Sequence, residues 1–216
     1  MVCVPRKRFN QLPAERRERL CESSARELSA KGFEGASLNR ILEGAGFSKG
    51  AAYYYFDSKE DLFAAAAREL LQASVAGVEA DALESANYWD ALEQIFLRQF
   101  EGWAKKPWTA EMTRALRSLP AAHVHPSVGE VIVEASGTLL KLLRRGKELG
   151  LIRQDLPDEL LANLVQSVDD AHDRWLLGQS PVDPGAAAKR ITCLLQRLLT
   201  AEPTKGRGHS SCRSRH

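Results

Sequence analysis

The sequence predicts an all-helical fold, in which an N-terminal three-helix unit of the helix-turn-helix type is joined by a long helix to a larger helical body. Apolar residues recur at helical spacing through segments that Gly and Pro separate, and no alternating run with the β-branched enrichment of a strand is present. Two short helical segments also meet at a glycine-bearing turn, which is typical of a helix-turn-helix. The 216 residues contain 44% hydrophobic and 27% charged side chains, which is ordinary for a globular protein.

The first predicted helix begins at Pro13 and runs for about 20 residues. Proline suits the first turn of a helix, and Gly32 is expected to end it. The apolar positions of this segment recur at i, i+4 and i+7 and are Cys21, Ala25 and Leu28. These residues are therefore expected to face the core.

Two short helices are expected next. Ser37 is a good N-cap for a helix that stops at the glycines of segment 44–46. Ser48 is a good N-cap for a second short helix over residues 49–56. The two helices and the turn between them have the spacing of a helix-turn-helix.

A long helix and five further helices complete the prediction. Ser58 and Asp61 form a capping-box pattern that begins a helix reaching residue 75. The later helices, divided mainly by prolines, are expected at about 87–105, 109–119, 127–149, 157–178 and 183–201. The domains expected are a helix-turn-helix unit over 1–57, a helical body over 58–202 and a disordered basic tail over 203–216.

Tyr53, Tyr54 and Tyr55 stand next to Phe56 in the second short helix. Successive side chains on a helix step by about 100°, so four consecutive aromatic rings cannot all face one core. In a helix-turn-helix the second helix inserts its N-terminal residues into the major groove, where a tyrosine ring can pack on sugar and its hydroxyl can reach a phosphate. An ordinary core role for the aromatic run remains the alternative.

The stretch from about Arg17 to Phe63 resembles the DNA-binding domain of the TetR/AcrR family of transcriptional regulators. The family pattern, Ser-Lys-Gly before a tyrosine-rich helix followed by a spaced Lys and Leu, reads FSKGAAYYYFDSKEDL over residues 47–62. The preceding GFEGASLNRILEGAG is similar to the family's second helix and turn. The match covers under a quarter of the chain. The resemblance implies a cytoplasmic homodimeric regulator, most often a repressor, that binds a palindromic double-stranded DNA operator.

The resemblance also implies which residues touch DNA. Carried over by position, with Arg40 beside Asn39 included, they are Ser37, Asn39, Arg40, Ser48, Lys49, Gly50, Ala51, Tyr53, Tyr54, Tyr55 and Lys59. Family members often have an arginine on the second helix that enters the groove, so the choice between Asn39 and Arg40 stays open. Lys49 is expected to donate a hydrogen bond to guanine, and Ala51 is expected to contact a thymine methyl group. Lys59 is expected to contact a phosphate. The basic segment 6–8 is either an arm on DNA or a solvated tail.

For the body, the resemblance implies dimerisation through the last two long helices and a pocket for a small-molecule effector. The resemblance implies that binding in this pocket moves the helix that begins near Ser58. This movement changes the distance between the two DNA-binding units of the dimer. Helical spacing indicates an aromatic, largely apolar lining and hence a largely apolar effector. The candidates are Phe96, Phe100, Trp103, Trp108, Met112, His123, His172 and Trp175. For each of them, packed core is the simpler alternative.

A rival interpretation comes from segment 169–173, whose His172-Asp173 dipeptide resembles metal-dependent phosphohydrolases of the HD class. Such enzymes need further His and Asp ligands from other helices. His123, His125 and Asp183 are available, but no spacing requires them. The segment is more simply the polar flank of an amphipathic helix. We therefore expect no enzyme, no metal and no cofactor.

The composition also bears on the remaining classes of protein, which are zinc-binding, disulfide-linked, membrane and secreted proteins. The four cysteines lie far apart with no Cys-x-x-Cys pair, so we expect reduced thiols, no zinc site and no disulfide. No apolar run suits a membrane span or a signal peptide, so a cytoplasmic protein without membrane contact is expected. Residues 1–60 hold 11 Lys and Arg against 8 Asp and Glu, whereas residues 61–202 hold 15 against 20. This asymmetry fits an N-terminal unit that meets phosphate.

Overall fold

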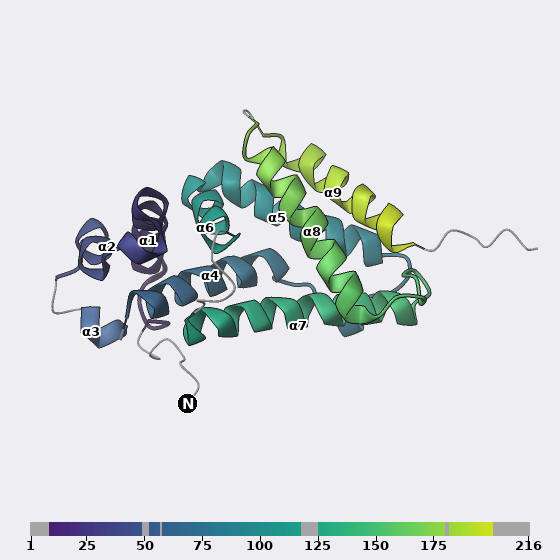
Figure 1. Cartoon of the computed structure of the whole chain (residues 1–216), viewed down its shortest axis with the longest axis horizontal. Helices are drawn as coiled ribbons and strands as arrows, with labels where there is room; N and C mark the ends of the chain where they lie inside the picture. Colours follow the sequence, from purple (N-terminus) through teal and green to yellow (C-terminus); the bar gives the residue numbers. More distant parts are fainter. Residues whose placement is uncertain (1–8, 49–51, 57, 118–124, 180–181, 201–216) are drawn as a thin grey trace, which may run out of the picture.

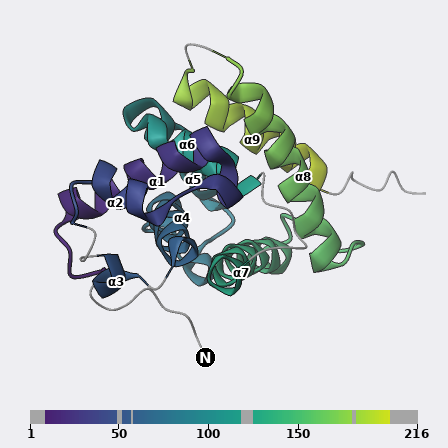
Figure 2. The ribbon, with the colours of Figure 1, turned by 60° about the vertical axis from the view of Figure 1, so that its left-hand side comes forward.

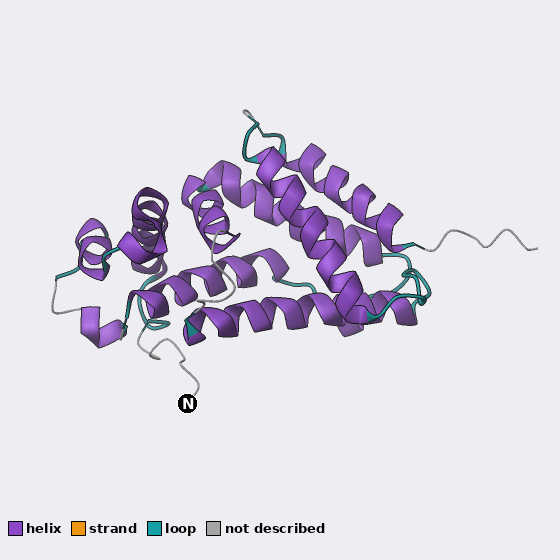
Figure 3. Ribbon diagram, in the orientation of Figure 1, coloured by secondary structure: helices purple, strands orange, loops and turns teal. Residues whose placement is uncertain are grey.

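The computed structural model describes residues 9–48, 52–56, 58–117, 125–179 and 182–200, and every regular element in those residues is helical (Figures 1 and 3). The predicted all-helical fold is confirmed. The helices are α1 (Ala14–Gly35), α2 (Leu38–Gly44), α3 (Ala52–Tyr55), α4 (Lys59–Val75), the 3-10 turn η2 (Ala80–Ala82), α5 (Tyr88–Lys105), α6 (Pro107–Arg117), α7 (Pro126–Glu148), α8 (Asp158–Leu176) and α9 (Pro184–Leu199). None of these described helices is long and apolar enough to cross a membrane.

Helices α1 to α3 and the start of α4 enclose a small core of their own. Its fully buried side chains are Phe9, Leu20, Ile41, Leu42, Phe56 and Leu62. The predicted break at Gly32 is present, since this residue has a φ of 67° inside the span of α1. Only glycine adopts that conformation readily, so the residues after it can turn toward α2.

Helix α4 lies beside α7 and connects the N-terminal unit to the body (Figures 1 and 2). The predicted cap at its start is confirmed, because the Ser58 side chain accepts a hydrogen bond of 3.2 Å from the N–H of Asp61. A run of small residues on α4, Ala64 to Ala67, is almost fully buried. Small side chains let neighbouring helices approach closely, so α4 is packed on several sides at once.

The body has a separate core made by α5, α7, α8 and α9. Tyr88 opens α5 as a fully buried residue, and its hydroxyl donates a 2.8 Å hydrogen bond to the carbonyl of Leu142 on α7. Burial raises the pKa of Tyr88 well above its usual range, so the hydroxyl keeps its proton. Gly146, one turn further along α7, provides the space for this ring.

Gly146→Ala is expected to destabilise the body by about 1–3 kcal/mol, the usual cost of overpacking a core. A Cβ at this position would lie 2.6 Å from both the Tyr88 hydroxyl and a methyl of Ile152. The matched control is Gly137→Ala in the same helix, where a Cβ meets nothing within 4 Å. That change should be neutral or stabilise by up to about 1 kcal/mol, because alanine favours helix. Urea unfolding, monitored by circular dichroism, gives the free energies of unfolding of the two variants. Equal stability of both variants would contradict the tight Tyr88 contact.

Candidate DNA-binding surface and internal cavity

Close contact with α1 positions α2 for a helix-turn-helix. The Ser23 hydroxyl on α1 donates a 2.7 Å hydrogen bond to the carbonyl of Ile41 on α2. A Cβ on Gly44 would lie 2.5 Å from the Ser23 oxygen, so the close approach requires glycine. Gly46 then reverses the chain with a φ of 75°. Both glycines of the predicted turn therefore have a geometric role.

The predicted contact residues on α2 lie at its exposed N-terminal end. Ser37 stands at the N-cap position, but its side chain makes no capping hydrogen bond, contrary to expectation. Its N–H instead donates to a Glu27 carboxylate oxygen at 3.2 Å. The same oxygen lies 3.2 Å from Nε of Arg40. Arg40 is thus held toward α1, whereas Asn39 is exposed at the helix surface.

The aromatic run divides between surface and core, as the rotation of a helix requires. Tyr54 is 50% exposed, whereas Phe56 is 1% exposed. Tyr55 is half-buried, and its ring packs edge-on against Phe47 at a centroid distance of 6.1 Å. The Tyr54 side chain is therefore accessible at the surface, and Tyr55 packs on the turn that precedes α3.

Helix α3 is described as Ala52–Tyr55, shorter than the predicted span of 49–56. At its C-terminal end Phe56 is no longer helical. The predicted contacts Lys49, Gly50 and Ala51, and the side chain of Tyr53, lie outside the described residues. Ser48 is exposed just before them, so its role as an N-cap remains a prediction.

The ammonium of Lys59, for which a phosphate contact is predicted, is engaged within the protein in this structure. Its ammonium donates to the carbonyl oxygens of Phe33, Glu34 and Ala36 at 2.8, 3.0 and 3.3 Å. It also lies 5.5 Å from the centre of the Phe33 ring. An ammonium has three donors, and all three are directed at carbonyls. Lys59 therefore fastens the end of α1 to the start of α4.

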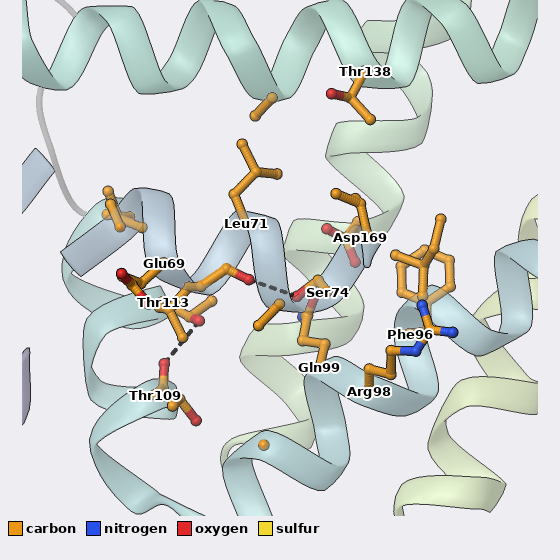
Figure 4. A pocket seen from close by; sticks show the side chains of 18 of the residues that line it. Glu69, Leu71, Ser74, Phe96, Arg98, Gln99, Thr109, Thr113, Thr138 and Asp169 are labelled. Carbon is orange, nitrogen blue, oxygen red and sulfur yellow. Dashed lines mark hydrogen bonds between the residues drawn. The ribbon is translucent and has the colours of Figure 1, made fainter. Parts of the chain in front are cut away.

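A cavity of about 690 Å³ lies between the helices of the body and the N-terminal unit, and Figure 4 shows part of its lining. Its walls come from α1, α4, α5, α6, α7, α8 and α9. The lining is mainly aliphatic and aromatic, with a few polar side chains. The volume is in the range of small-molecule pockets, about 300–1,000 Å³.

Three of the eight predicted pocket residues, Phe96, Trp103 and Trp108, line the cavity. Phe100 and Met112 are 0% exposed and belong to the packed cores behind it, which is the simpler alternative stated for them. His123 lies outside the described residues.

The remaining two predicted pocket residues, His172 and Trp175, are not in the lining. His172 is buried against Phe100, with a centroid distance of 5.6 Å. Trp175 is 49% exposed, and the Arg190 guanidinium of α9 stacks 4.7 Å above its ring. Both predictions are therefore corrected, because His172 packs on α5 and Trp175 packs on α9, outside the lining.

Several polar lining residues were missed by the sequence prediction. Asp169 of α8, Gln99 of α5 and Ser74 of α4 all line the cavity. Gln99 donates to a carboxylate oxygen of Asp173 at 3.1 Å. Asp173 lies one helical turn from Asp169, so Gln99 and Asp169 belong to the same part of the wall. Helical periodicity places a polar residue on a face but does not show which helices meet there.

The cavity reaches the N-terminal unit, because Arg17, Glu18 and Cys21 of α1 form part of its wall. Two ion pairs fix α1 at this point. Nε of Arg17 lies 3.3 Å from a Glu69 oxygen on α4, and Nζ of Lys106 lies 2.8 Å from a Glu18 oxygen. A molecule in the cavity would therefore contact the helices that carry the helix-turn-helix.

Polar contacts join α4 to α7 along the first half of both helices. The Ser127 hydroxyl donates to a carboxylate oxygen of Asp61 at 2.5 Å, and both side chains are buried. Two turns further along, Nε of Arg68 donates to a Glu134 oxygen at 2.9 Å. The two pairs have the same separation of 66 residues, so the helices run parallel in register.

The described residues contain no group of three or more His, Cys, Asp or Glu side chains that could hold a metal ion. His172 Nδ1 lies 3.8 Å from a carboxylate oxygen of Asp173. The other oxygen of that carboxylate is bound by the Gln99 amide. The His-Asp dipeptide is thus part of the packing between α5 and α8, and the hydrolase interpretation is not supported.

A family model described as "Bacterial regulatory proteins, tetR family" matches residues 20–72, which span the segment from α1 to α4. The transcriptional repressor AcnR of Corynebacterium diphtheriae is 29% identical over 158 residues, covering 72% of this chain and 77% of the relative. The DNA-binding segment of the chain, residues 20–72, therefore matches the TetR family. The resemblance inferred from the helix-turn-helix motif is confirmed, and the protein is a DNA-binding transcriptional regulator.

Solved structures extend the similarity of fold to most of the chain. The fatty acid degradation regulator FadR of Bacillus halodurans superposes with a TM-score of 0.68 at 22% identity, over 82% of this chain and 96% of that one. FadR of Bacillus subtilis, solved in complex with stearoyl-CoA, gives 0.67 at 21% identity over the same shares. At this identity the similarity shows the fold alone.

Proposed function

We propose that the protein is a ligand-responsive repressor that acts in the cytoplasm. It binds a palindromic DNA operator as a homodimer and releases it when a small molecule occupies the central cavity. The observation that supports this most strongly is that α1 and α4, which carry the helix-turn-helix, also form part of the cavity wall. A bound molecule therefore touches the DNA-binding unit directly.

The DNA-binding surface is proposed to be the exposed side of α2 and α3. The exposed side chains of Asn39, Ser48 and Tyr54 are among its described members. Asn39 can pair with an adenine edge, and the Tyr54 hydroxyl can reach a phosphate. The predicted contacts at Ser37, Ser48, Lys49, Gly50, Ala51 and Tyr53 complete the surface in this proposal.

The dimer is proposed to form through α8 and α9. These helices lie side by side at one edge of the molecule (Figures 1 and 2). They present three large, partly exposed apolar side chains, Leu160, Trp175 and Leu194. Exposed large apolar side chains along a pair of helices favour burial against a partner. A two-fold dimer places two copies of the DNA-binding surface on a palindrome.

The coupling between the cavity and the DNA-binding unit is proposed to pass through α4. Its first half is fixed to α7 by the Asp61–Ser127 and Arg68–Glu134 hydrogen bonds. Its second half, which includes Leu71 and Ser74, lines the cavity. A molecule that displaces the second half therefore rotates α4 about the fixed half. Because α4 is continuous with the DNA-binding unit, the spacing between the two units of a dimer changes, and the operator is released.

Lys49→Ala is expected to relax the base preference at one or two operator positions by about 1–3 kcal/mol, because Lys49 is the residue proposed to donate to guanine. The measurement is selection of wild-type and variant protein against the same randomised duplex library. Tyr54→Phe is the comparison, since loss of a phosphate contact weakens binding on all sequences alike. A uniform loss for Lys49→Ala would contradict the base-reading role.

The release step is tested by fluorescence anisotropy of a labelled duplex obtained from that selection. Compounds are added at fixed protein concentration, and tryptophan emission is followed in parallel. Trp103 and Trp108 line the cavity, so a compound that binds there changes the emission. The proposal expects the same compounds to change the emission and release the duplex at the same concentration. Release by compounds that leave the emission unchanged would place the effector site elsewhere.

A further inference from the structure

The first turn of α1 carries an exposed cation, Arg16, whose charge does not stabilise the helix. Arg16 lies three residues after the N-cap Pro13, and its backbone N–H donates a 2.9 Å hydrogen bond to the Pro13 carbonyl. The start of a helix is the positive end of its dipole, so a cation there is unfavourable. The stability of α1 therefore does not explain the charge of Arg16.

Arg16 also differs from the other exposed arginines of α1 and α2, because each of those pairs with a carboxylate. The pairs, at 2.5–3.2 Å, are Arg19–Glu15, Arg26–Glu22 and Arg40–Glu27. Within the described residues, no carboxylate pairs with Arg16 and no acceptor takes a hydrogen bond from its guanidinium. The charge of Arg16 is thus open to an anion from outside the protein.

An aromatic ring fixes the position of this guanidinium. Its central carbon lies 5.2 Å from the centre of the Phe47 ring, over the ring face. A cation in this position is attracted by the ring. Stacking uses the flat face of the guanidinium and leaves the N–H groups around its edge for another partner. A side chain held in this way loses less conformational entropy when it binds.

The stacked pair lies beside α3, the helix proposed to enter the major groove. Phe47 belongs to the turn before α3, its ring packs on Tyr55, and Tyr55 packs on Tyr54 at a centroid distance of 5.0 Å. The major groove is only about 12 Å wide, so a helix inside it has a row of phosphates on each side. A cation at the flank of the helix suits one of these phosphates rather than a base edge.

We propose that Arg16 contacts a phosphate of double-stranded DNA and that the DNA-binding surface extends from α2 and α3 onto the first turn of α1. The inference rests on the proposed DNA-binding surface and adds a contact to it from a different helix. Phe47 is the positioning residue, because its ring holds the guanidinium at the flank of α3. A phosphate contact contributes affinity and orientation and carries no base preference.

Arg16→Ala tests the contact through the salt dependence of DNA binding. The affinity of the full-length protein is measured by fluorescence anisotropy between about 50 and 200 mM salt, on the selected operator and on an unrelated duplex of equal length. The slope of log K against log salt is expected to become less steep by about 0.9 for each bound protomer. Affinity at physiological salt is expected to fall about threefold to tenfold per protomer on both duplexes. An unchanged salt slope, or a loss confined to particular base pairs of the operator, would overturn the inference.

Two further variants separate a phosphate contact from a general effect of charge. Lys141→Ala removes an exposed cation from α7, in the body, and is expected to leave the salt slope unchanged. Arg16→Lys keeps a charge at the same position and is expected to retain most of the slope. An equal change of slope in Lys141→Ala and Arg16→Ala would show an effect of net charge and would contradict the contact.

Phe47→Leu tests the positioning role, because leucine keeps an apolar side chain in the turn but removes the ring. In this background Arg16→Ala is expected to cost less affinity than it does in the wild type, since an unstacked arginine is less ordered before binding. The same loss in both backgrounds would contradict the positioning by Phe47.

The two duplexes distinguish this inference from the proposed function. If Arg16→Ala lowers the salt slope on the unrelated duplex but selection enriches no operator, the phosphate contact stands and the operator function fails. If the operator is bound and released by cavity ligands while Arg16→Ala behaves as the wild type does, the function stands and the contact fails. Thermal unfolding shows that the variant is folded, with a Tm expected within about 4 °C of the wild type, because an exposed stacked cation contributes little to stability.

Discussion

Asp61→Ala is expected to lower the free energy of unfolding by about 2–3 kcal/mol, the range for a buried hydrogen bond to a charged group. The Asp61 carboxylate accepts from the buried Ser127 hydroxyl at the start of α7. Removing the carboxylate leaves this hydroxyl without its acceptor and frees the first turn of α4 from α7. We also expect weaker operator binding, because α4 then no longer holds the DNA-binding unit in one orientation.

A double-mutant cycle with Ser127→Ala isolates the pair, and the coupling energy is expected to be about 1–2 kcal/mol. Asp90→Ala is the control, since Asp90 is also in the first turn of a helix but is exposed. Urea unfolding gives the stabilities, and anisotropy gives the operator affinities. Additive effects of the two substitutions would show that the α4–α7 contact does not depend on this hydrogen bond.

Lys59→Met is expected to destabilise the N-terminal unit by about 1.5–3 kcal/mol, because the carbonyls at the end of α1 lose a charged donor. Those carbonyls belong to Phe33, Glu34 and Ala36. Methionine keeps most of the apolar stem, so the loss is mainly that of the hydrogen bonds. Thermal unfolding and operator affinity are measured together.

Lys59→Arg decides between the structural role and a phosphate contact. A planar guanidinium cannot direct three donors at the same three carbonyls, but it binds phosphate well. The structure therefore predicts that Lys59→Arg loses stability much as Lys59→Met does. Full stability with normal operator affinity in Lys59→Arg would support the phosphate contact instead. Lys31→Met, an exposed change near the end of α1, is the control.

The positions of the helices were predictable because local signals mark them. Helix α5 is expected over 87–105 and is Tyr88–Lys105, which ends two residues before Pro107. Prolines at 107, 126 and 184 begin α6, α7 and α9, as the fixed φ of proline favours. The N-cap at Ser58 was likewise visible in the sequence.

Side-chain roles that depend on tertiary contact were not predictable in the same way. Lys59 occupies a position that suits a phosphate contact, and only the approach of α1 turns its ammonium toward three carbonyls. Trp175 follows the buried Leu161 and Val165 on the same helix, yet nearly three turns beyond Val165 it is exposed and meets Arg190. A stripe on one helix does not show where its packing ends.

The residues that line the cavity show the same limit of prediction from the sequence. Phe96 and Trp103 were found from their spacing on α5, because one helix carries both. Gln99 lies on the same helix between them, but it becomes a ligand candidate only when α8 brings Asp173 and Asp169 to it. Its role depends on the packing of two segments about 70 residues apart, which no local pattern records.

The central claim, that this chain is a dimeric reader of a specific operator, is tested most directly by selection of the full-length protein against a randomised duplex library at physiological salt. The account predicts an enriched inverted repeat whose half-site centres are about one helical turn or more apart, bound by two or more copies of the chain. Binding that weakens with salt and enriches no sequence, or an enriched site without two-fold symmetry, would contradict it.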